Sequence, residues 1–351
     1  MLSREFTLSE AEGKHLAGRQ PKETMNVNLN VKRYDPDERS PRYQTYTIDV
    51  PEAATVLDAL IEVRETKDET LALRCSCRSS ICGSCAMRIN GRARLACKTK
   101  AIDMAPAGEP ITVEPAGNMP VLKDLIVDFE VFWDKIKAIK PWLQTEGPPP
   151  EREYIVPNEA MLNLNTTVAC IMCGACVSDC LSLEADPNFL GPAALAKAYR
   201  YVGDPRDAHK EERLRELCGA GGIWDCTHCF NCVEVCPKEV APMDWIIELR
   251  REAEVAGNIN YNGVRHSKVF AESVKESAWL DEGRLALDSF GDIGGKLAMV
   301  PVGLRAIMKG KMPKTGPFHY KRPGAEHVHR LFEELEHKDL KGIKLDTLDA
   351  E

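Results

Sequence analysis

The sequence predicts an α+β protein with a sheet in its first part, an all-helical second part and a C-terminal extension. Three observations lead to this prediction. Residues 25–33 and 43–50 alternate apolar and polar side chains, which is the period of a half-buried strand. From Val121 to Pro141 the apolar residues recur at helical spacing instead. Twelve of the fourteen cysteines fall into three groups of four, and two of these groups lie in the helical part.

The composition limits the classes of function. A length of 351 residues suffices for two or three domains, and 46 Lys and Arg against 54 Asp and Glu give a net charge of -8. This balance argues against a nucleic-acid binder, which needs cations to neutralise phosphates. The chain has no run of about 18 uncharged apolar residues, so we expect no transmembrane helix of its own and at most a peripheral membrane association.

The N-terminal residues 1–22 predict an extension without a targeting signal. Charged residues, among them Glu5, Glu10 and Glu12, leave no apolar core for a secretory signal and disfavour a transit peptide. We therefore expect a reducing, cytoplasmic location. In such a compartment cysteines serve more often as metal ligands than in disulfides.

The spacing of the cysteines is typical of iron-sulfur clusters. The first group has the plant-type [2Fe-2S] spacing C-x4-C-x2-C with a fourth cysteine downstream, and it consists of Cys77, Cys82, Cys85 and Cys97. The other two groups have the bacterial ferredoxin run C-x2-C-x2-C-x3-C, and they consist of Cys170, Cys173, Cys176 and Cys180, and of Cys226, Cys229, Cys232 and Cys236.

The two bacterial-type runs predict a crossed arrangement. In two-cluster ferredoxins the three-residue gap turns the fourth thiolate onto the neighbouring cluster. A [4Fe-4S] cluster is therefore expected on Cys170, Cys173, Cys176 and Cys236, and a third cluster on Cys180, Cys226, Cys229 and Cys232. Structural zinc is the alternative for repeated C-x2-C pairs, but it requires neither a crossed fourth ligand nor the plant-type group.

Residues 23–122 predict a small β-grasp domain of the ferredoxin type. The two alternating strands form a hairpin, and Thr55 with Asp58 resembles a capping box at the start of a helix. The cluster loop follows this helix. The later elements are a tight hairpin at Asn90-Gly91 and a strand over 111–114.

Residues 123–255 predict an all-helical domain that holds two cubane-type clusters, with helices over 192–202 and 242–254. Gly83, Gly174 and their neighbours are expected to donate N–H groups to the cluster sulfurs, although ordinary turn glycines explain these two positions equally well. Cys75 and Cys218 lie outside the groups and are expected to be plain thiols.

Residues 256–351 predict a C-terminal extension. Its stretch 295–313 is basic and amphipathic, which fits either a segment that docks on a membrane face or anchor subunit, or a helix packed on the body of the protein. The whole chain has no P-loop, H-E-x-x-H or G-x-S-x-G motif. We therefore expect electron transfer and no independent catalytic site.

Together with the cluster spacing, several stretches resemble the iron-sulfur subunit of succinate dehydrogenase and fumarate reductase. They are residues 77–85, 119–128, 189–200, 204–207 and 232–238. The resemblance covers roughly residues 25–255. It implies a flavoprotein partner that oxidises succinate at FAD or reduces fumarate, and a membrane-anchor partner with a quinone site. Electrons would pass from FAD to the Cys77 cluster, then to the Cys170 cluster and then to the third cluster, on the cytoplasmic face of the cytoplasmic membrane.

The sequence departs from the family at two places near the third cluster. Many members lack the cysteine at the position of Cys229 and hold a [3Fe-4S] cluster there, whereas four thiolates here favour a second [4Fe-4S] cluster. Family residues that contact the quinone are replaced by Leu181, Ala185 and Thr227, with His228 one position late, so we expect a modified quinone site.

Two other function classes stay open on the sequence alone. The complete third group and the long extension also fit the iron-sulfur subunit of a heterodisulfide-reductase-like or glycerol-3-phosphate dehydrogenase-like complex. A free ferredoxin carrier is a non-enzymatic alternative. The N-terminal [2Fe-2S] group combined with the 119–128 and 189–207 stretches favours the succinate:quinone oxidoreductase subunit.

Overall fold

The structure, a computed structural model, describes residues 24–162, 164–258, 260–311 and 322–337. The chain divides into two compact units, which are described separately: residues 1–208 with 226–247, and residues 209–225 with 248–351. The domain boundaries predicted from the sequence, after residues 122 and 255, are based on the cysteine motifs and differ from the limits of these units. They stay predictions. The predicted extension 1–22 lies outside the described residues.

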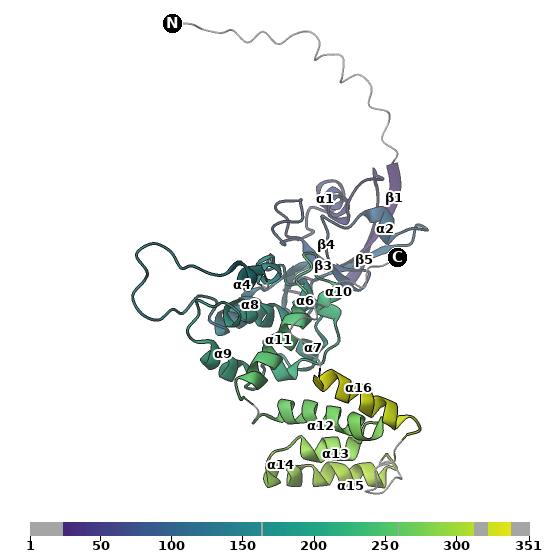
Figure 1. The fold of residues 1–351 in the computed structure, drawn as a ribbon. Helices are drawn as coiled ribbons and strands as arrows, with labels where there is room; N and C mark the ends of the chain where they lie inside the picture. Colours follow the sequence, from purple (N-terminus) through teal and green to yellow (C-terminus); the bar gives the residue numbers. More distant parts are fainter. Residues whose placement is uncertain (1–23, 163, 259, 312–321, 338–351) are drawn as a thin grey trace. The chain divides into compact units, whose positions relative to one another are not determined.

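A five-stranded sheet forms the N-terminal part of the first unit (Figure 1). Its strand order is β2-β1-β5-β3-β4, in which β1 and β5 are parallel and all other neighbours are antiparallel. The strands are β1 (Thr24–Arg33), β2 (Arg42–Pro51), β3 (Ala86–Ile89), β4 (Arg92–Leu95) and β5 (Ile111–Glu114). Both predicted hairpins are confirmed, and Asn90 and Gly91 adopt φ values of 49° and 78°, as a type I′ turn requires.

Helix α1 (Val56–Thr66) packs against this sheet and completes the β-grasp arrangement. The predicted capping box is present: the Thr55 hydroxyl accepts the Asp58 N–H at 3.2 Å, and the Asp58 carboxylate accepts the Thr55 N–H at 2.9 Å. Leu57 and Leu60 of the helix are fully buried with Leu29 of β1. This apolar core supports the loop that carries the first cysteine group.

The helical period predicted from Val121 is wrong for residues 121–127. They form a two-stranded ribbon of β6 (Val121–Lys123) and β7 (Ile126–Val127), and helix α3 (Glu130–Ala138) begins after it. Asp124 turns the chain with a φ of 46°. Its buried carboxylate accepts hydrogen bonds from Arg33 Nε and from the N–H groups of Tyr34 and Ala72 at 2.9 to 3.0 Å. These long-range hydrogen bonds favour the ribbon over the helix that the local apolar spacing predicts.

Short helices make up the rest of the first unit. The predicted helices over 192–202 and 242–254 are confirmed as α8 (Pro192–Val202) and α11 (Pro242–Val255), whose Tyr199 and Trp245 rings stack at 4.7 Å. The other helices are α2 (Ala101–Met104), α4 (Asn158–Leu162), α5 (Asn165–Val168), α6 (Ala175–Ser178), α7 (Leu181–Ala185) and α10 (Asn231–Glu234). The sequence prediction of a sheet domain followed by a helical region is thus confirmed.

The second unit is helical, and helix α11 continues into it from the first unit. Helix α12 packs against α13 and α16 (Figure 1). The basic stretch predicted over 295–313 lies largely in α14 and α15, and residues 312 and 313 are outside the described part. The elements are α9 (Lys210–Leu217), η2 (Ile223–Asp225), α12 (Asn262–Ser277), α13 (Glu282–Asp288), α14 (Ile293–Ala298), α15 (Val300–Met308) and α16 (Ala325–His337). No helix among the described residues is long and apolar enough to cross a membrane.

Candidate iron-sulfur cluster sites

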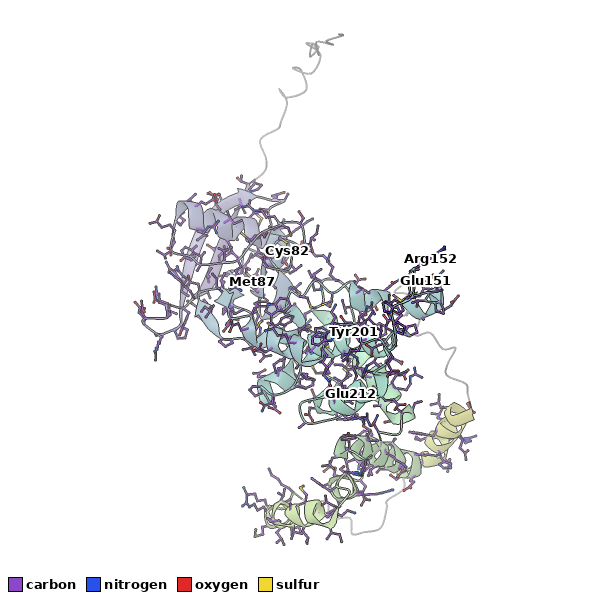
Figure 2. The ribbon with its side chains drawn as sticks, turned by 90° about the vertical axis from the view of Figure 1, so that its left-hand side faces the viewer. Cys82, Met87, Glu151, Arg152, Tyr201 and Glu212 are labelled. Carbon is purple, nitrogen blue, oxygen red and sulfur yellow. The ribbon has the colours of Figure 1, made fainter. Side chains whose placement is uncertain are left out.

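The sheet brings the first cysteine group together. Cys77 and Cys82 lie in the loop after α1, and Cys85 directly precedes β3. Cys97 follows β4, whose pairing with β3 continues in the Ala96 N–H bond to the Cys85 carbonyl at 3.1 Å. Cys85 is buried, whereas Cys82 is exposed at the surface of the first unit (Figure 2). The group therefore has one side in the core and one side in solvent.

The first cysteine loop turns its backbone donors onto the sulfurs. Cys77 Sγ accepts the N–H groups of Ser79, Ile81 and Cys82 at 3.3 to 3.4 Å, and Cys97 Sγ accepts the Ser80 N–H at 3.3 Å. Positive φ values within the loop, 58° at Ser80 among them, allow this tight winding. N–H donors stabilise negative charge on sulfur, which is the charge that a reduced cluster carries.

The thiols of this group interact with one another. Burial, reinforced by the neighbouring Cys97 and Cys82 thiols, raises the pKa of Cys85 to about 12. Hydrogen bonds from the Ser84 hydroxyl, from backbone N–H groups and from Cys77 lower the pKa of Cys82 to about 6. The four predicted ligands are thus electrostatic neighbours in a chain from Cys77 through Cys82 and Cys85 to Cys97.

Four cysteines of the two bacterial-type runs surround one apolar cavity in the first unit. They are Cys170, Cys173, Cys176 and Cys236, which is the crossed set expected from the spacing. Ala193, Val240 and Pro242 complete much of its wall. Burial raises the pKa of Cys173 to about 11, and its neighbours Cys170 and Cys236 contribute to the same shift. Four thiols converging on an apolar cavity fit an iron-sulfur cubane, in which the iron atoms hold the thiolates deprotonated.

The remaining four cysteines of these runs form the other crossed set. Cys180 has Cys226 and Cys229 as electrostatic neighbours, and Cys232 has Cys226, Cys180 and Cys229. Burial raises the pKa of Cys180, and it raises that of Cys232 to about 12. Cys180 lies just before α7 and Cys232 lies in α10, so this set joins two segments that are distant in sequence.

A backbone contact and an electrostatic interaction link the three sets in series. A Cβ on Gly83 would lie 2.6 Å from the Cys173 Cβ, so the first cysteine loop touches the second set directly. Cys176 has Cys232 among its electrostatic neighbours, which joins the second set to the third. No group of three or more His, Cys, Asp and Glu side chains among the described residues could hold a single metal ion. In a cubane each thiolate binds its own iron, so its ligands need not converge on one point.

Two polar side chains that the sequence analysis did not identify position the cysteine loops. The Asn118 amide donates to the carbonyls of Val177 and Cys180 at 2.8 and 3.0 Å. The Asp179 carboxylate accepts the buried Ala93 N–H of β4 at 2.8 Å. Asp179 thus ties β4 to the segment around Cys180, and Asn118 ties the loop after β5 to the same segment. The only sequence signal was the position of Asp179 beside a cysteine, because their partners are distant in sequence.

The glycines and the two ungrouped cysteines have other environments. Gly83 and Gly174 adopt φ values of 74° and 77° and allow close approach, and the residues before Gly83 supply the N–H donors described above. Cys218 is buried, and burial raises the pKa of its thiol. Cys75 packs against the sheet core. Neither environment suggests that these two thiols belong to any of the three sets.

Comparison with known proteins identifies the family to which the chain belongs. Residues 28–134 match the family described as 2Fe-2S iron-sulfur cluster binding domain, and residues 167–240 match the 4Fe-4S dicluster domain. The fumarate reductase iron-sulfur subunit of Mycobacterium tuberculosis is 40% identical over 219 residues, which are 62% of this chain and 88% of the relative. The chain belongs to the iron-sulfur subunits of succinate dehydrogenase and fumarate reductase.

Other members of this iron-sulfur subunit family agree. The succinate dehydrogenase iron-sulfur subunit of Paracoccus denitrificans is 37% identical over 234 residues, covering 66% of this chain and 89% of the relative. A chain of the Mycobacterium smegmatis Sdh1 complex in the apo form matches with a TM-score of 0.60 and 28% identity, covering 66% of this chain and 96% of that chain. The matched domains end at residue 240, so the C-terminal helices lie beyond them.

Proposed function

We propose that this subunit carries electrons between the FAD of a flavoprotein partner and a quinone at a membrane-anchor partner, through three clusters. The family membership and the [2Fe-2S] and [4Fe-4S] domains establish an iron-sulfur subunit of the succinate dehydrogenase and fumarate reductase class. The observation that supports the finer proposal is the succession of three neighbouring four-cysteine sets within one unit. The complex would lie on the cytoplasmic face of the cytoplasmic membrane.

The proposed ligands follow the three sets. Cys77, Cys82, Cys85 and Cys97 would hold the [2Fe-2S] cluster, and the shared apolar cavity supports a [4Fe-4S] cluster on Cys170, Cys173, Cys176 and Cys236. When bound, the clusters supply one-electron chemistry. The chain's own groups hold and tune them through thiolates, N–H donors and burial.

We propose a second [4Fe-4S] cluster at the third set. Cys229 is an electrostatic neighbour of both Cys180 and Cys232, so a fourth thiol is available beside Cys226. A [3Fe-4S] cluster would need only three of these ligands. The presence of the fourth thiol at this position supports the four-iron form.

The third set also supports an apolar acceptor nearby. Leu181 and Phe230, each next to a cysteine of this set, are exposed to 49% and 45%. The backbone N–H of Thr227 donates a hydrogen bond to the Ser182 hydroxyl at 3.1 Å. An exposed apolar edge beside the last cluster suits a quinone ring, with Leu181 in place of the usual family residue.

The test is purification of the native complex under mild conditions. We expect the chain to copurify with a flavoprotein, and succinate to reduce the [2Fe-2S] centre. A Cys82→Ser variant should keep the flavoprotein but lose that signal, whereas Cys75→Ser should lose neither. Recovery of the chain alone without flavin would indicate a free ferredoxin, and reduction by glycerol 3-phosphate instead of succinate would indicate the other enzyme class.

A further inference from the structure

Helices α14 and α15 of the second unit expose an unusual number of large apolar side chains. Ile293 and Leu297 of α14 are exposed to 78% and 63%, and Leu304, Ile307 and Met308 of α15 to 55%, 59% and 78%. Val300 and Val302 are also about half exposed. Exposed apolar patches of this kind mark interaction surfaces.

Four of the five large apolar side chains that α15 exposes lie on one face of the helix, and Val302 lies on the opposite side. Val300, Leu304, Ile307 and Met308 are spaced i, i+4, i+7 and i+8, which places them in one stripe. The half-buried positions are Met299, Gly303 and Ala306, which share a different side of the helix. The helix thus keeps Gly303 and Ala306 partly covered and turns its large apolar residues outward.

This segment is also strongly basic. Residues 293–311 contain four cations and no acidic residue, on a chain of net charge -8, and the cations are Lys296, Arg305, Lys309 and Lys311. Lys296 pairs with Asp288 at 3.3 Å. Arg305, Lys309 and Lys311 form no ion pair with any described residue. Arg305 and Lys309, four residues apart, border the apolar stripe on one side.

We propose that α14 and α15 bind the anionic surface of a lipid membrane, lying in its interface. An apolar helix face bordered by Lys and Arg, on a helix too short to span, is the pattern of interfacial membrane helices. The apolar stripe would enter the headgroup boundary. The cations would contact lipid phosphates, which attract them by charge complementarity.

Other occupants fit this charge pattern less well. Lysine is depleted at protein interfaces, yet three of the four cations here are lysines. A second copy of the chain would bring the same cations face to face across a symmetric interface, with like-charge repulsion. The lipid surface is therefore the occupant that the observations favour.

The proposal is independent of the proposed electron path. The last cysteine of the chain is Cys236, so residues 293–311 carry none of the cluster ligands. Loss of lipid binding would leave the cluster signals intact, and loss of a cluster ligand would leave this surface intact. The two proposals can therefore fail separately.

The experiment measures cosedimentation of the purified full-length chain with vesicles. The probes are vesicles of phosphatidylcholine alone and of phosphatidylcholine mixed with phosphatidylglycerol. We expect at least tenfold tighter binding to the mixed vesicles, and weaker binding as salt is raised. Visible absorbance of the clusters and circular dichroism verify that each protein is folded.

Variants separate the apolar and the charged contributions. Leu304→Glu with Ile307→Glu should reduce binding at least tenfold, and Arg305→Gln with Lys309→Gln should reduce it about fivefold per cation removed. The matched controls are Ile155→Glu, at a side chain exposed to 92%, and Lys67→Gln, at an exposed lysine. Both controls should bind like the wild type.

Several results would overturn the proposal. These are equal binding to both kinds of vesicle, equal loss in the controls, and no binding unless an anchor subunit is present. Light scattering that shows a dimer abolished by Leu304→Glu, without vesicle binding, would assign the surface to self-association instead.

Discussion

Gly83 has no side chain, and the space that a Cβ would need is taken by Cys173. A Cβ at this glycine would lie 2.6 Å from the Cys173 Cβ, and the glycine also adopts a φ of 74°. A side chain here must push the first cysteine loop away from the second set. A single backbone position therefore controls the separation of these two sets. Electrons would pass between them, so their rate of transfer depends on this position.

Gly83→Ala should slow electron transfer from the first to the second cluster, and it should destabilise the protein by more than the roughly 1 to 2 kcal/mol of left-handed backbone strain. Stepwise reduction followed by rapid-freeze EPR measures the transfer. Gly91→Ala is the matched control, because its φ is 78° but no atom lies within 4 Å of its Cβ position. Equal effects of both substitutions would show that only strain matters.

Cys229 is the residue that distinguishes a four-iron from a three-iron third site. Cys229→Ser should change the EPR signal of the third centre and leave the other two intact, because the chain's other two sets do not include it. Cys75→Ser, outside all three sets, should leave iron content and all signals unchanged. An unchanged third signal in Cys229→Ser would argue against ligation by this residue.

At the scale of elements, buried carboxylates hold the turns that follow helices and join strands. The Asp204 side chain, fully buried at the end of α8, pairs with Arg206 at 2.8 Å and with Arg200. Burial alone would raise the pKa of Asp204, but the hydrogen bonds from both arginines outweigh it, and the pKa lies well below its usual value. Asp124 plays a comparable part in the β6–β7 ribbon.

A lowered pKa in the folded state predicts a specific dependence of stability on pH. The contribution of Asp204 is fully present above its unfolded pKa of about 3.9 and is lost progressively as pH falls from that value through the lower pKa of the folded state. Asp204→Asn should therefore cost about 3 kcal/mol at pH 7, because it removes the buried carboxylate that pairs with two partly buried arginines. Denaturant titrations at pH 7 and below pH 4 measure this difference. A cost that does not shrink in acid would contradict the assignment.

The local or distant origin of each interaction explains which features can be predicted from the sequence. The Thr55 capping box, the Asn90-Gly91 turn and the alternating strands are local signals, so they were predictable. Asp124 acts through residues far away in the chain, which no periodicity contains. Residues 121–127 therefore form a two-stranded ribbon around the Asp124 turn, where the apolar spacing predicts a helix.

At the scale of the whole molecule, the crossed cysteine sets tie together segments that the sequence separates. The spacing alone predicted which cysteines would be neighbours, because the three-residue gap is a local feature. The contact between Gly83 and Cys173 and the bond from Asp179 to Ala93 could not be predicted, since they depend on how the helical part packs against the sheet. These contacts set the order of the proposed path.

Metal binding and folding are expected to be coupled in this molecule. Chelation of iron should raise hydrogen exchange across residues 167–240 far more than across β1 and β2, because the sheet core has its own apolar packing. Hydrogen exchange with mass spectrometry measures both regions in one sample. A uniform rise along the chain would contradict the view that the clusters staple mainly the helical part.

We propose that three four-thiolate sets hold three clusters in series. Low-temperature EPR on the natively purified complex, first oxidised and then reduced stepwise with succinate and dithionite, tests it most directly. We expect a silent oxidised sample and three signals that appear in turn on reduction. A strong signal in the oxidised sample would reveal a [3Fe-4S] centre, and it would contradict ligation of the third cluster by all four cysteines.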